Sequence, residues 1–349
     1  MNEQHVNDPQ LRQRGRASVE FLVQMLKSSG PVFGQVNADI ASVLPDPEAL
    51  PDDLDERHEA MDAMLAGSHS YAAQRLLGDW HGRMHGRVSA EAYAEIADDL
   101  APVLEAASQG PATIEYDPDL AFPDYYDGVN FHRTTGGWTD NPNQGMIHGE
   151  LIHRKMLGRT FPGGIFKQRE AVAAMAPRDH YERILDMGCS SGHFTYALQT
   201  VYPDAQIIGI DYSAVMMEHA WRTANANGWD WKLYQRGAEA TGFDDGSFDL
   251  VASYIILHEM PEDAIRQTFA EAFRVLEPGG DMLMSDVTRY DDLDKLSVWK
   301  ADRGAKYGGE PHWRESAQLD LAQIARDAGF VGAKAEGQYP HVVQGRKPA

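Results

Sequence analysis

The chain has 349 residues, of which 43% are hydrophobic and 24% charged, and its formal net charge is −22. An average field this negative repels polyphosphates, and no basic patch is evident in the sequence, so we expect no nucleic-acid partner. The single cysteine, Cys189, excludes an intramolecular disulfide framework and a multi-cysteine zinc site and agrees with a reducing compartment. No apolar run reaches the about 18 residues of a membrane span, and residues 1–16 lack the apolar stretch of a secretory signal, so we expect a cytoplasmic protein without membrane contact.

The first third of the chain has a helical pattern. Apolar residues recur at three- and four-residue spacing between residues 10 and 109, as in Val19, Leu22, Val23 and Leu26 and again in Ala92, Ile96, Leu100 and Leu104. A loop rich in proline and aspartate covers residues 45–55, and residues 116–145 carry turn signals with little periodicity. We therefore expect residues 1–150 to form a mainly α-helical N-terminal domain, which could pair two subunits in a homodimer or line a substrate pocket.

From Arg183 onward, short apolar runs alternate with helix-like stretches. Strict alternation of strands and helices predicts a parallel sheet with helices on both faces. The end of the chain differs, because residues 316–330 predict a helix ending at Gly329 and residues 333–345 contain two short strands only a few residues apart. Such strands suit an antiparallel hairpin at the sheet edge. Residues 151–349 are thus expected to form an α/β domain.

The most informative turn lies in residues 184–194, ILDMGCSSGHF. A strand ends at Asp186, and Gly188 and Gly192 flank a tight turn into a helix expected to begin near His193. Glycines allow the backbone to approach a ligand, and the free N–H groups of a helix N-terminus attract an anion such as a carboxylate. Asp211 ends the next strand, 25 residues after Asp186, where a carboxylate can accept both hydroxyls of a ribose. Up to this point a nicotinamide-binding dehydrogenase fits nearly as well.

Three further segments favour another class. Residues 236–263 (RGAEATGFDDGSFDLVASYIILHEMPED), 273–280 (FRVLEPGG) and 281–287 (DMLMSDV) follow in order. Together with the glycine turn they resemble the consecutive motifs of class I S-adenosylmethionine-dependent methyltransferases, over roughly residues 183–347. The resemblance implies a Rossmann-like seven-stranded sheet with an antiparallel final hairpin, S-adenosylmethionine as the cofactor, and methyl transfer to a small-molecule acceptor.

The resemblance also implies which residues contact the cofactor. On the methionine part these are Asp186, Gly188, Ser190 and Gly192, with Tyr254 near the amino group. On the nucleoside part they are Asp211 at the ribose and Tyr212, Ala238 and Glu239 at the adenine. Alternatives stay open at three positions: Asp186 can simply cap the helix turn, Asp211 can be a turn residue, and Tyr254 can be ordinary packing.

Two residues depart from the family pattern. Ser190 replaces the middle glycine of the usual first motif, and Gly237 stands where many members have an aspartate that binds the adenine amine. These departures motivate a rival interpretation, in which the fold and the cofactor pocket serve a cyclisation, decarboxylation or binding role without methyl transfer.

His258 is the candidate catalytic residue. It follows the fourth strand of the α/β domain, at the sheet edge where such folds place their ligands, and Glu259 is next to it. The segment is similar to one in which small-molecule O-methyltransferases carry a catalytic histidine beside an acid. We therefore expect an oxygen acceptor with His258 as general base, while sulfur, nitrogen or carbon acceptors and a purely structural histidine remain alternatives.

A second polar cluster lies between residues 132 and 153. Its three histidines and one glutamate could bind a divalent metal. However, His148 and His153 are five residues apart, and this spacing does not align two side chains on one face of an α-helix. We therefore expect no metal. His81 and His85 have a four-residue spacing but sit in a polar helix and are expected to face solvent. Residues 288–316 are expected to form either a lid or packing against the N-terminal domain. The resulting acceptor-pocket candidates are His132, Arg133, Trp138, His148, His153 and Trp299.

Overall fold

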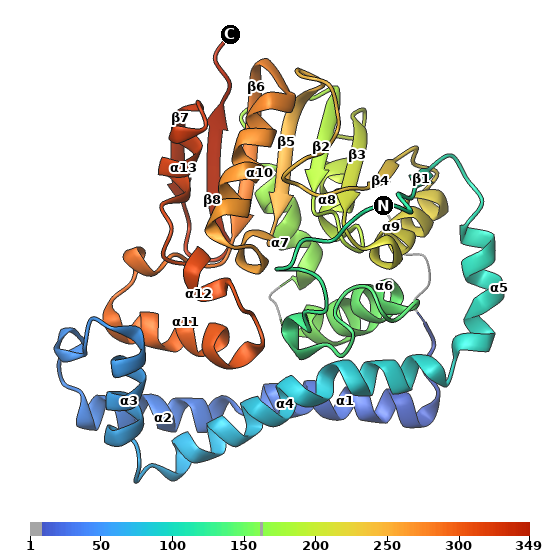
Figure 1. Ribbon diagram of the computed structural model, residues 1–349. Coiled ribbons are helices and arrows are strands. Elements are labelled where there is room, and N and C mark those ends of the chain that lie inside the picture. Colours follow the sequence, from blue (N-terminus) through green and yellow to red (C-terminus); the bar gives the residue numbers. More distant parts are fainter. Residues whose placement is uncertain (1–8, 161–162) are drawn as a thin grey trace.

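The computed structural model describes residues 9–160 and 163–349. Residues 1–8 of the expected N-terminal domain lie outside the described residues. They include half of residues 1–16, the segment in which we expected no secretory signal. An α/β layer structure stands above a long helical arm (Figure 1). Both parts of the predicted fold class are therefore confirmed.

A single mixed sheet forms the centre of the α/β part, with the strand order β1-β4-β3-β2-β5-β6-β8-β7. All neighbouring strands are parallel except at β8, which runs antiparallel to both β6 and β7. The predicted final hairpin is confirmed. The strands are β1 (Thr113–Glu115), β2 (Arg183–Met187), β3 (Gln206–Asp211), β4 (Lys232–Gln235), β5 (Phe248–Tyr254), β6 (Leu276–Asp286), β7 (Val331–Glu336) and β8 (His341–Arg346).

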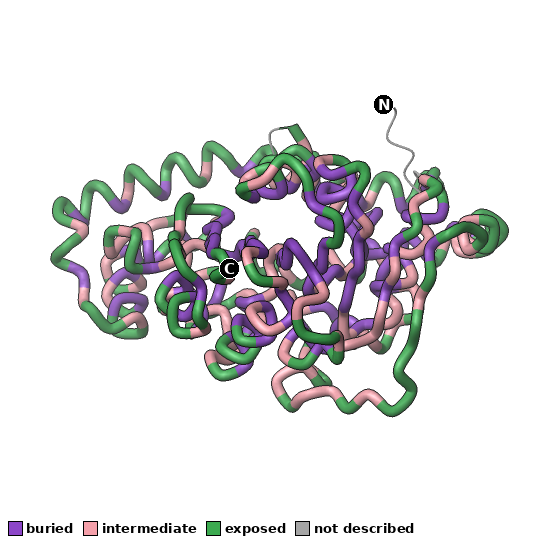
Figure 2. Tube along the Cα trace, turned by 90° about the horizontal axis from the view of Figure 1, so that it is seen from above, coloured by how far each residue is buried: buried purple, intermediate pink, exposed green. Residues whose placement is uncertain are grey.

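Helices cover both faces of this sheet, as the alternating side chains of a buried strand require. In β2, Ile184 packs into one hydrophobic cluster and its neighbour Leu185 into the other. The first cluster includes α7 (Gly164–Ala173), α8 (His193–Val201) and α9 (Ala214–Asn227), and the second includes α10 (Glu262–Val275) and α13 (Leu321–Asp327). The central strands β2 and β5 are accordingly buried along nearly their whole length, whereas the edge strands β1 and β7 are mostly exposed. Figure 2 shows buried residues concentrated in the interior of the molecule.

The sheet has eight strands, and seven of them, β2 to β8, lie within residues 183–346, as expected for that part of the chain. The additional strand, β1, comes from the region expected to be helical or irregular and pairs parallel with β4 at the edge of the sheet. It has only three residues, of which Ile114 packs against the core. A strand this short has too few residues to show a period of two, so its pairing partner and not its own pattern defines it.

Five helices form the N-terminal arm. They are α1 (Gln13–Ser28), α2 (Gly30–Val43), α3 (Leu54–Met64), α4 (His69–Ala94) and α5 (Ala97–Ala107), with a short 3₁₀ turn, η1 (Pro47–Ala49), between α2 and α3. The long helix α4 runs along α1 and α2 beneath the α/β part (Figure 1). Leu22 and Val23 of α1 and Ala92 of α4 share one hydrophobic cluster with η3, a π-helix over Ile147–Met156. The expected domain division between residues 150 and 151 falls inside this helix.

Two connecting regions link the arm to the α/β part. Before the π-helix, the predicted irregular region contains only the one-turn η2 (Phe131–Arg133) and α6 (Gln144–Met146), and η4 (Leu157–Arg159) follows it. After β5 comes η5 (Leu257–Glu259). After β6 come η6 (Tyr290–Asp292), α11 (Lys295–Gly308) and α12 (Trp313–Ser316), and α11 lies against α3 of the arm. The insertion predicted over residues 288–316 thus bridges the sheet and the arm.

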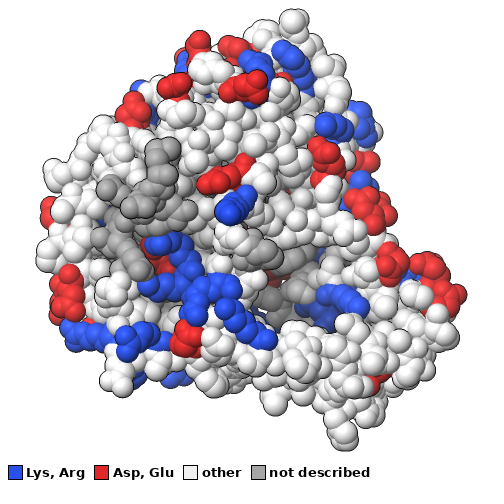
Figure 3. All heavy atoms as spheres, turned by 180° about the vertical axis from the view of Figure 1, so that it is seen from behind, with Lys and Arg blue, Asp and Glu red and all other residues white. Residues whose placement is uncertain are grey.

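Charged side chains are unevenly distributed over the surface (Figure 3). Although acidic residues predominate in the chain, lysine and arginine side chains gather over the lower part of the back face (Figure 3), where the sequence alone had shown no basic patch. Across residues 9–160 and 163–349, none of the helices has the length and apolarity needed to cross a membrane.

Candidate active site

One cavity of about 820 Å³ lies at the carboxyl ends of the central strands. Its wall includes residues that directly follow β2, β3 and β5, residues of α4 in the arm, residues of η2 and η3, and residues of α11. Ligands of open α/β sheets bind at this edge, where the strand order reverses. Here the arm and the insertion close the edge into a deep pocket.

The glycine-rich turn after β2 has the backbone that a ligand-binding turn requires. Gly188 and Gly192 have φ of 73° and 83°, and Ser190, at the position where the family motif has glycine, also lies in the left-handed region with φ 50°. A non-glycine residue in this region stores strain that is typical of functional sites. The backbone N–H of Ser190 donates to Asp211 Oδ2 at 2.8 Å, which holds the turn against the end of β3.

Two of the expected cofactor residues do not reach the cavity wall. Asp186 is fully buried and accepts a hydrogen bond from Thr195 at 2.6 Å, and burial raises its pKa to about 7. Gly192 begins α8, where an added Cβ would lie 2.8 Å from the Cβ of Ala220, so it permits close packing between α8 and α9. Both residues therefore support the turn from behind.

Asp211 lies on the cavity wall, where a ribose would be held. Its carboxylate accepts backbone N–H bonds from Ser190 and from Ser213, each at 2.8 Å. Burial raises its pKa to about 6, although these two donors lower it. Each oxygen keeps a lone pair for a further donor.

The expected adenine end is also assembled on the wall, and it explains the glycine at position 237. Tyr212, Ala238 and Glu239 all line the cavity. Tyr212 and Tyr125 both donate their hydroxyl groups to Glu239. A Cβ at Gly237 would collide with the hydroxyl of Tyr212. Tyr212 and Glu239 therefore occupy the space beside Gly237 in this chain.

Arg169 of α7 is a cavity residue that the sequence did not reveal. It is 8% exposed, its guanidinium carbon lies 4.6 Å from the centre of the Tyr254 ring, and it donates to the carbonyl of Ile165. Within the described residues, no carboxylate pairs with it, and burial lowers its pKa. A buried cation without a counter-charge is costly, which favours an anionic ligand group beside it. No local motif marks this arginine, because its role depends on the packing of α7 against α8.

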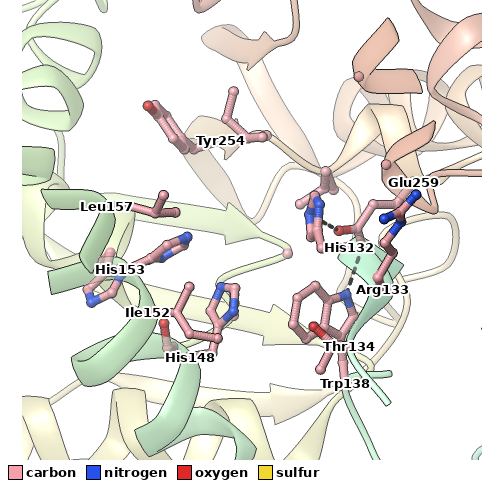
Figure 4. Close-up of a pocket in the computed structure, with 18 of the residues that line it drawn as sticks. His132, Arg133, Thr134, Trp138, His148, Ile152, His153, Leu157, Tyr254 and Glu259 are labelled. Atoms are coloured by element: carbon pink, nitrogen blue, oxygen red, sulfur yellow. Dashed lines mark hydrogen bonds and ion pairs between the residues drawn. The ribbon is translucent and has the colours of Figure 1, made fainter. Parts of the chain in front are cut away.

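The acceptor side of the wall brings together five of the six predicted residues, His132, Arg133, Trp138, His148 and His153 (Figure 4). The five-residue spacing of His148 and His153 was expected to separate their side chains, and this expectation is wrong. Both residues lie in a π-helix, whose wide turn is closed by hydrogen bonds between residues five apart and therefore brings them to one side of the helix. Their ring centres are 4.1 Å apart. Burial lowers the pKa of His148 to about 3 and that of His153 well below its ordinary value, so both rings are neutral at pH 7.

His132 is held between two carboxylates. Its Nδ1 lies 2.6 Å from Glu310 Oε1, its Nε2 lies 3.5 Å from Glu259 Oε1, and Trp138 Nε1 donates to Glu259 at 3.2 Å (Figure 4). Burial opposes the charge on this imidazole, but the hydrogen bonds to Glu259 and Glu310 outweigh it and raise its pKa to about 10. Glu310 was not found by sequence analysis, since it is 178 residues from His132.

His258 lies behind this group and not on the cavity wall. It is 1% exposed, and its Nδ1 is 3.1 Å from Asp286 Oδ1, which orients the ring. Burial acts against its charge, but Asp286 raises its pKa. The remaining nitrogen, Nε2, is buried and has no partner among the described residues.

Two expectations about surrounding residues need correction. Trp299 does not line the cavity but packs, 2% exposed, against α2, α3 and α4, so α11 contributes Arg303 and Tyr307 to the wall instead. His81 and His85 do not face solvent: they line the cavity, with nearly parallel rings 5.8 Å apart. Their four-residue spacing was the signal that could have revealed them.

Fold and wall together define a class I S-adenosylmethionine-dependent methyltransferase domain. The parallel sheet with its antiparallel hairpin, the glycine turn and the strand-end aspartate occur in the order of that class, with S-adenosylmethionine as its cofactor.

Comparison with known proteins agrees with this assignment. A family described as "Methyltransferase domain" matches residues 184–280. The malonyl-(acyl-carrier protein) O-methyltransferase of Legionella pneumophila is 32% identical over 36% of this chain and 42% of its own length. The arsenite methyltransferase of Aquipseudomonas alcaligenes is 30% identical over 43% of this chain and 44% of its own. The ubiquinone/menaquinone biosynthesis C-methyltransferase UbiE of Desulfotalea psychrophila is 31% identical over 34% of this chain and 47% of its own. The chain thus spans about half the length of the curated relatives it matches.

Proposed function

We propose that this chain transfers the methyl group of S-adenosylmethionine to a small molecule bound in the same cavity. One observation carries the proposal: the expected cofactor residues Gly188, Asp211 and Glu239, His148 of the π-helix and Arg303 of the insertion line one continuous space. A volume of about 820 Å³ leaves room for an acceptor beside the cofactor.

The chemistry requires little beyond positioning. The sulfonium of the cofactor already activates the methyl group, so the protein must hold nucleophile, methyl carbon and sulfur in line. The rigid strand ends fix the cofactor, while Trp138 and the neutral rings of His148 and His153 form the facing wall. An acceptor between these surfaces would lose most of its water shell.

For the acceptor atom we retain oxygen, with His258 as candidate general base. The Asp286 contact supports this assignment, since it leaves Nε2 as the free nitrogen of His258. The burial of His258 behind His132 and Glu259 argues against direct contact with the acceptor, so the base remains a prediction. The three relatives described above are named for methylation of oxygen, arsenite and carbon, so they do not identify the acceptor atom of this chain.

Two measurements test the proposal. Calorimetry should show binding of S-adenosylhomocysteine and none of NAD, since the motifs after Asp211 fit a methyltransferase and not a dehydrogenase. S-adenosylmethionine labelled in its methyl group should then pass label to a member of a panel of phenols, carboxylic acids, amines and thiols. Tight cofactor binding with no labelled product from any panel member would instead support the rival, non-methylating use of the pocket.

The assembly of the protein is a further part of the proposal. Phe21 of α1 and Leu76 of α4 are 60% and 70% exposed, and such apolar side chains on the arm support the expected homodimer. Sedimentation equilibrium of the purified chain would decide between monomer and dimer. The cytoplasmic location stays a prediction.

A further inference from the structure

The group formed by His132, His258, Glu259 and Glu310 has the composition and spacing of a metal site. Each residue offers one ligand atom, and these four atoms lie within 4.8 Å of one another. Four ligands around a tetrahedral zinc-sized ion at about 2.0–2.2 Å are separated by about 3.3–3.6 Å. Side-chain adjustments of about 1 Å would therefore close the group around an ion.

The backbone delivers two of these ligands at a conformational cost. His132 and Arg133 both have positive φ, 52° and 58°, which non-glycine residues rarely adopt. Gly309 has φ 84°, and a Cβ there would lie 3.0 Å from the backbone nitrogen of Arg133. The strained turn and the glycine bring Glu310 to His132, whose backbone N–H donates to Glu310 Oε1 at 2.5 Å. Strain of this kind persists where function requires it.

Two buried atoms of this group have no hydrogen-bond partner in the part of the chain that the structure describes, although each would have one if the four side chains formed a closed network of ion pairs. Glu310 is 4% exposed, and its Oε2 has no hydrogen-bond partner among the described residues. The same holds for Nε2 of His258. Leaving buried polar atoms unpaired is energetically costly. An ion at the centre of the group would satisfy both.

The surroundings of His258 match those of a metal-bound histidine. Asp286 occupies Nδ1 and thereby leaves Nε2 for the ion, as carboxylates commonly do behind ligating histidines. Asp286 is itself fixed by the backbone N–H groups of Leu257 and Val287, at 2.6 and 2.7 Å. Trp138 similarly fixes Glu259. Both outer contacts hold the ligands in place.

We propose that His132, His258, Glu259 and Glu310 bind a divalent first-row transition-metal ion at the wall of the cavity. With the ion bound, Nε2 of His258 is a ligand and no longer a general base, so this inference replaces that assignment of His258. Two imidazoles and two carboxylates without a thiolate suit Zn²⁺, Mn²⁺, Co²⁺ or Fe²⁺. Since His132 and Glu259 line the cavity, the open side of the ion faces the bound molecules. The proposal departs from the expectation of no metal, which rested on the spacing of His148 and His153. Of the cluster between residues 132 and 153, His132 alone belongs to this group.

The test uses the full chain after treatment with a chelator. Calorimetric titration with MnCl₂, ZnCl₂ and CoCl₂ should show one ion per chain, and bound Co²⁺ should give the visible absorption of a mixed nitrogen and oxygen ligand set. Asp286→Asn should weaken binding by about 10–100-fold, the usual effect of losing an outer contact. Glu310→Gln and, as a more exposed second variant, Glu259→Gln should weaken it further.

Glu239→Gln is the matched control, because Glu239 lies on the same cavity wall outside the group. It should bind Co²⁺ with unchanged affinity and spectrum. Far-ultraviolet circular dichroism and a cooperative thermal transition confirm that each variant is folded, and no cofactor or acceptor is needed, so failure of the metal site and failure of the proposed methyl transfer are separable. A wild-type chain that binds S-adenosylhomocysteine but none of the three ions, or a Glu239→Gln loss equal to that of Glu310→Gln, overturns the proposal.

Discussion

The two halves of the cavity are built in different ways. The cofactor half consists of turns that directly follow β2, β3 and β5 and are fixed by short backbone contacts, such as Ser190 to Asp211. The acceptor half combines α4, η2, η3 and α11, with rings and charges contributed by segments far apart in the chain. One half can therefore keep its ligand while the other changes, and variants should separate the two functions.

The largest expected effect concerns the contact between the insertion and the arm. The buried Asp302 of α11 accepts from His58 Nε2 at 2.8 Å, Tyr290 Oη at 2.9 Å and Arg314 Nη2 at 2.7 Å. Asp302→Asn breaks a buried ion pair and should lower the free energy of unfolding by about 3–5 kcal/mol, as measured by denaturant titration. The affinity for S-adenosylhomocysteine in the remaining folded protein should stay unchanged.

This variant also has a defined pH dependence. Burial alone would raise the pKa of Asp302, but its bonds to His58, Arg314 and Tyr290 hold that pKa below its ordinary value. The contribution to stability is therefore fully present above the unfolded pKa of about 4 and lost as pH falls further. The difference between wild type and Asp302→Asn should be constant from about pH 6 to 8. Asp291→Asn, in an exposed pair with Arg289, is the control and should change stability little.

Next in size is the loss of the ribose contact. Asp211→Asn keeps the shape of the side chain but removes the charge that would accept two hydroxyls. At about 1.5–3 kcal/mol for a hydrogen bond to a charged group, the affinity for S-adenosylhomocysteine should fall by about 100-fold or more. Binding of 5′-methylthioadenosine, which has the same ribose, should fall equally. Unchanged calorimetric affinities would mean that the ribose is held elsewhere.

Arg169→Met should have a smaller and more selective effect. If Arg169 pairs with the carboxylate of the methionine part, the affinity for S-adenosylhomocysteine should fall by about 10–100-fold. The affinity for 5′-methylthioadenosine, which lacks that carboxylate, should not change. The ligand-free variant should melt at a higher temperature, because a buried and unpaired charge is removed. Equal losses for both ligands would contradict this role.

The smallest expected effect lies in the acceptor half. Arg303 lines the cavity, donates to the Tyr71 hydroxyl at 2.6 Å and has no carboxylate partner within the part of the chain that the structure describes. With an acceptor that carries an anionic group, Arg303→Met should raise KM by about 10-fold and leave kcat unchanged. Steady-state kinetics check this, and an unchanged KM for such an acceptor would place the anion elsewhere.

The same contrast explains how much of the protein could be predicted from its sequence. Gly188, Asp211 and Glu239 could be predicted to lie together on one wall, because each lies at or shortly after the end of a strand within a short motif. The acceptor half could be predicted only as a group of candidates, because contacts such as His132 to Glu310 depend on tertiary packing.

Two local features could not be predicted from the sequence for other reasons. A helical period of 3.6 was assumed for His148 and His153, whereas the chain forms a π-helix there. Trp299 lies on the apolar side of an amphipathic helix, and this side packs against the arm and not against the cavity. The amphipathic pattern alone does not specify which of the two it contacts.

The short strand β1 has a consequence for dissecting the chain. Because Thr113–Glu115 covers the outer edge of β4, a fragment beginning at residue 151 would expose a row of unpaired backbone groups on that strand. Exposed edges of this kind template intermolecular strand pairing. The methyltransferase domain therefore depends on the preceding chain for its colloidal stability, and a soluble fragment must begin before residue 113.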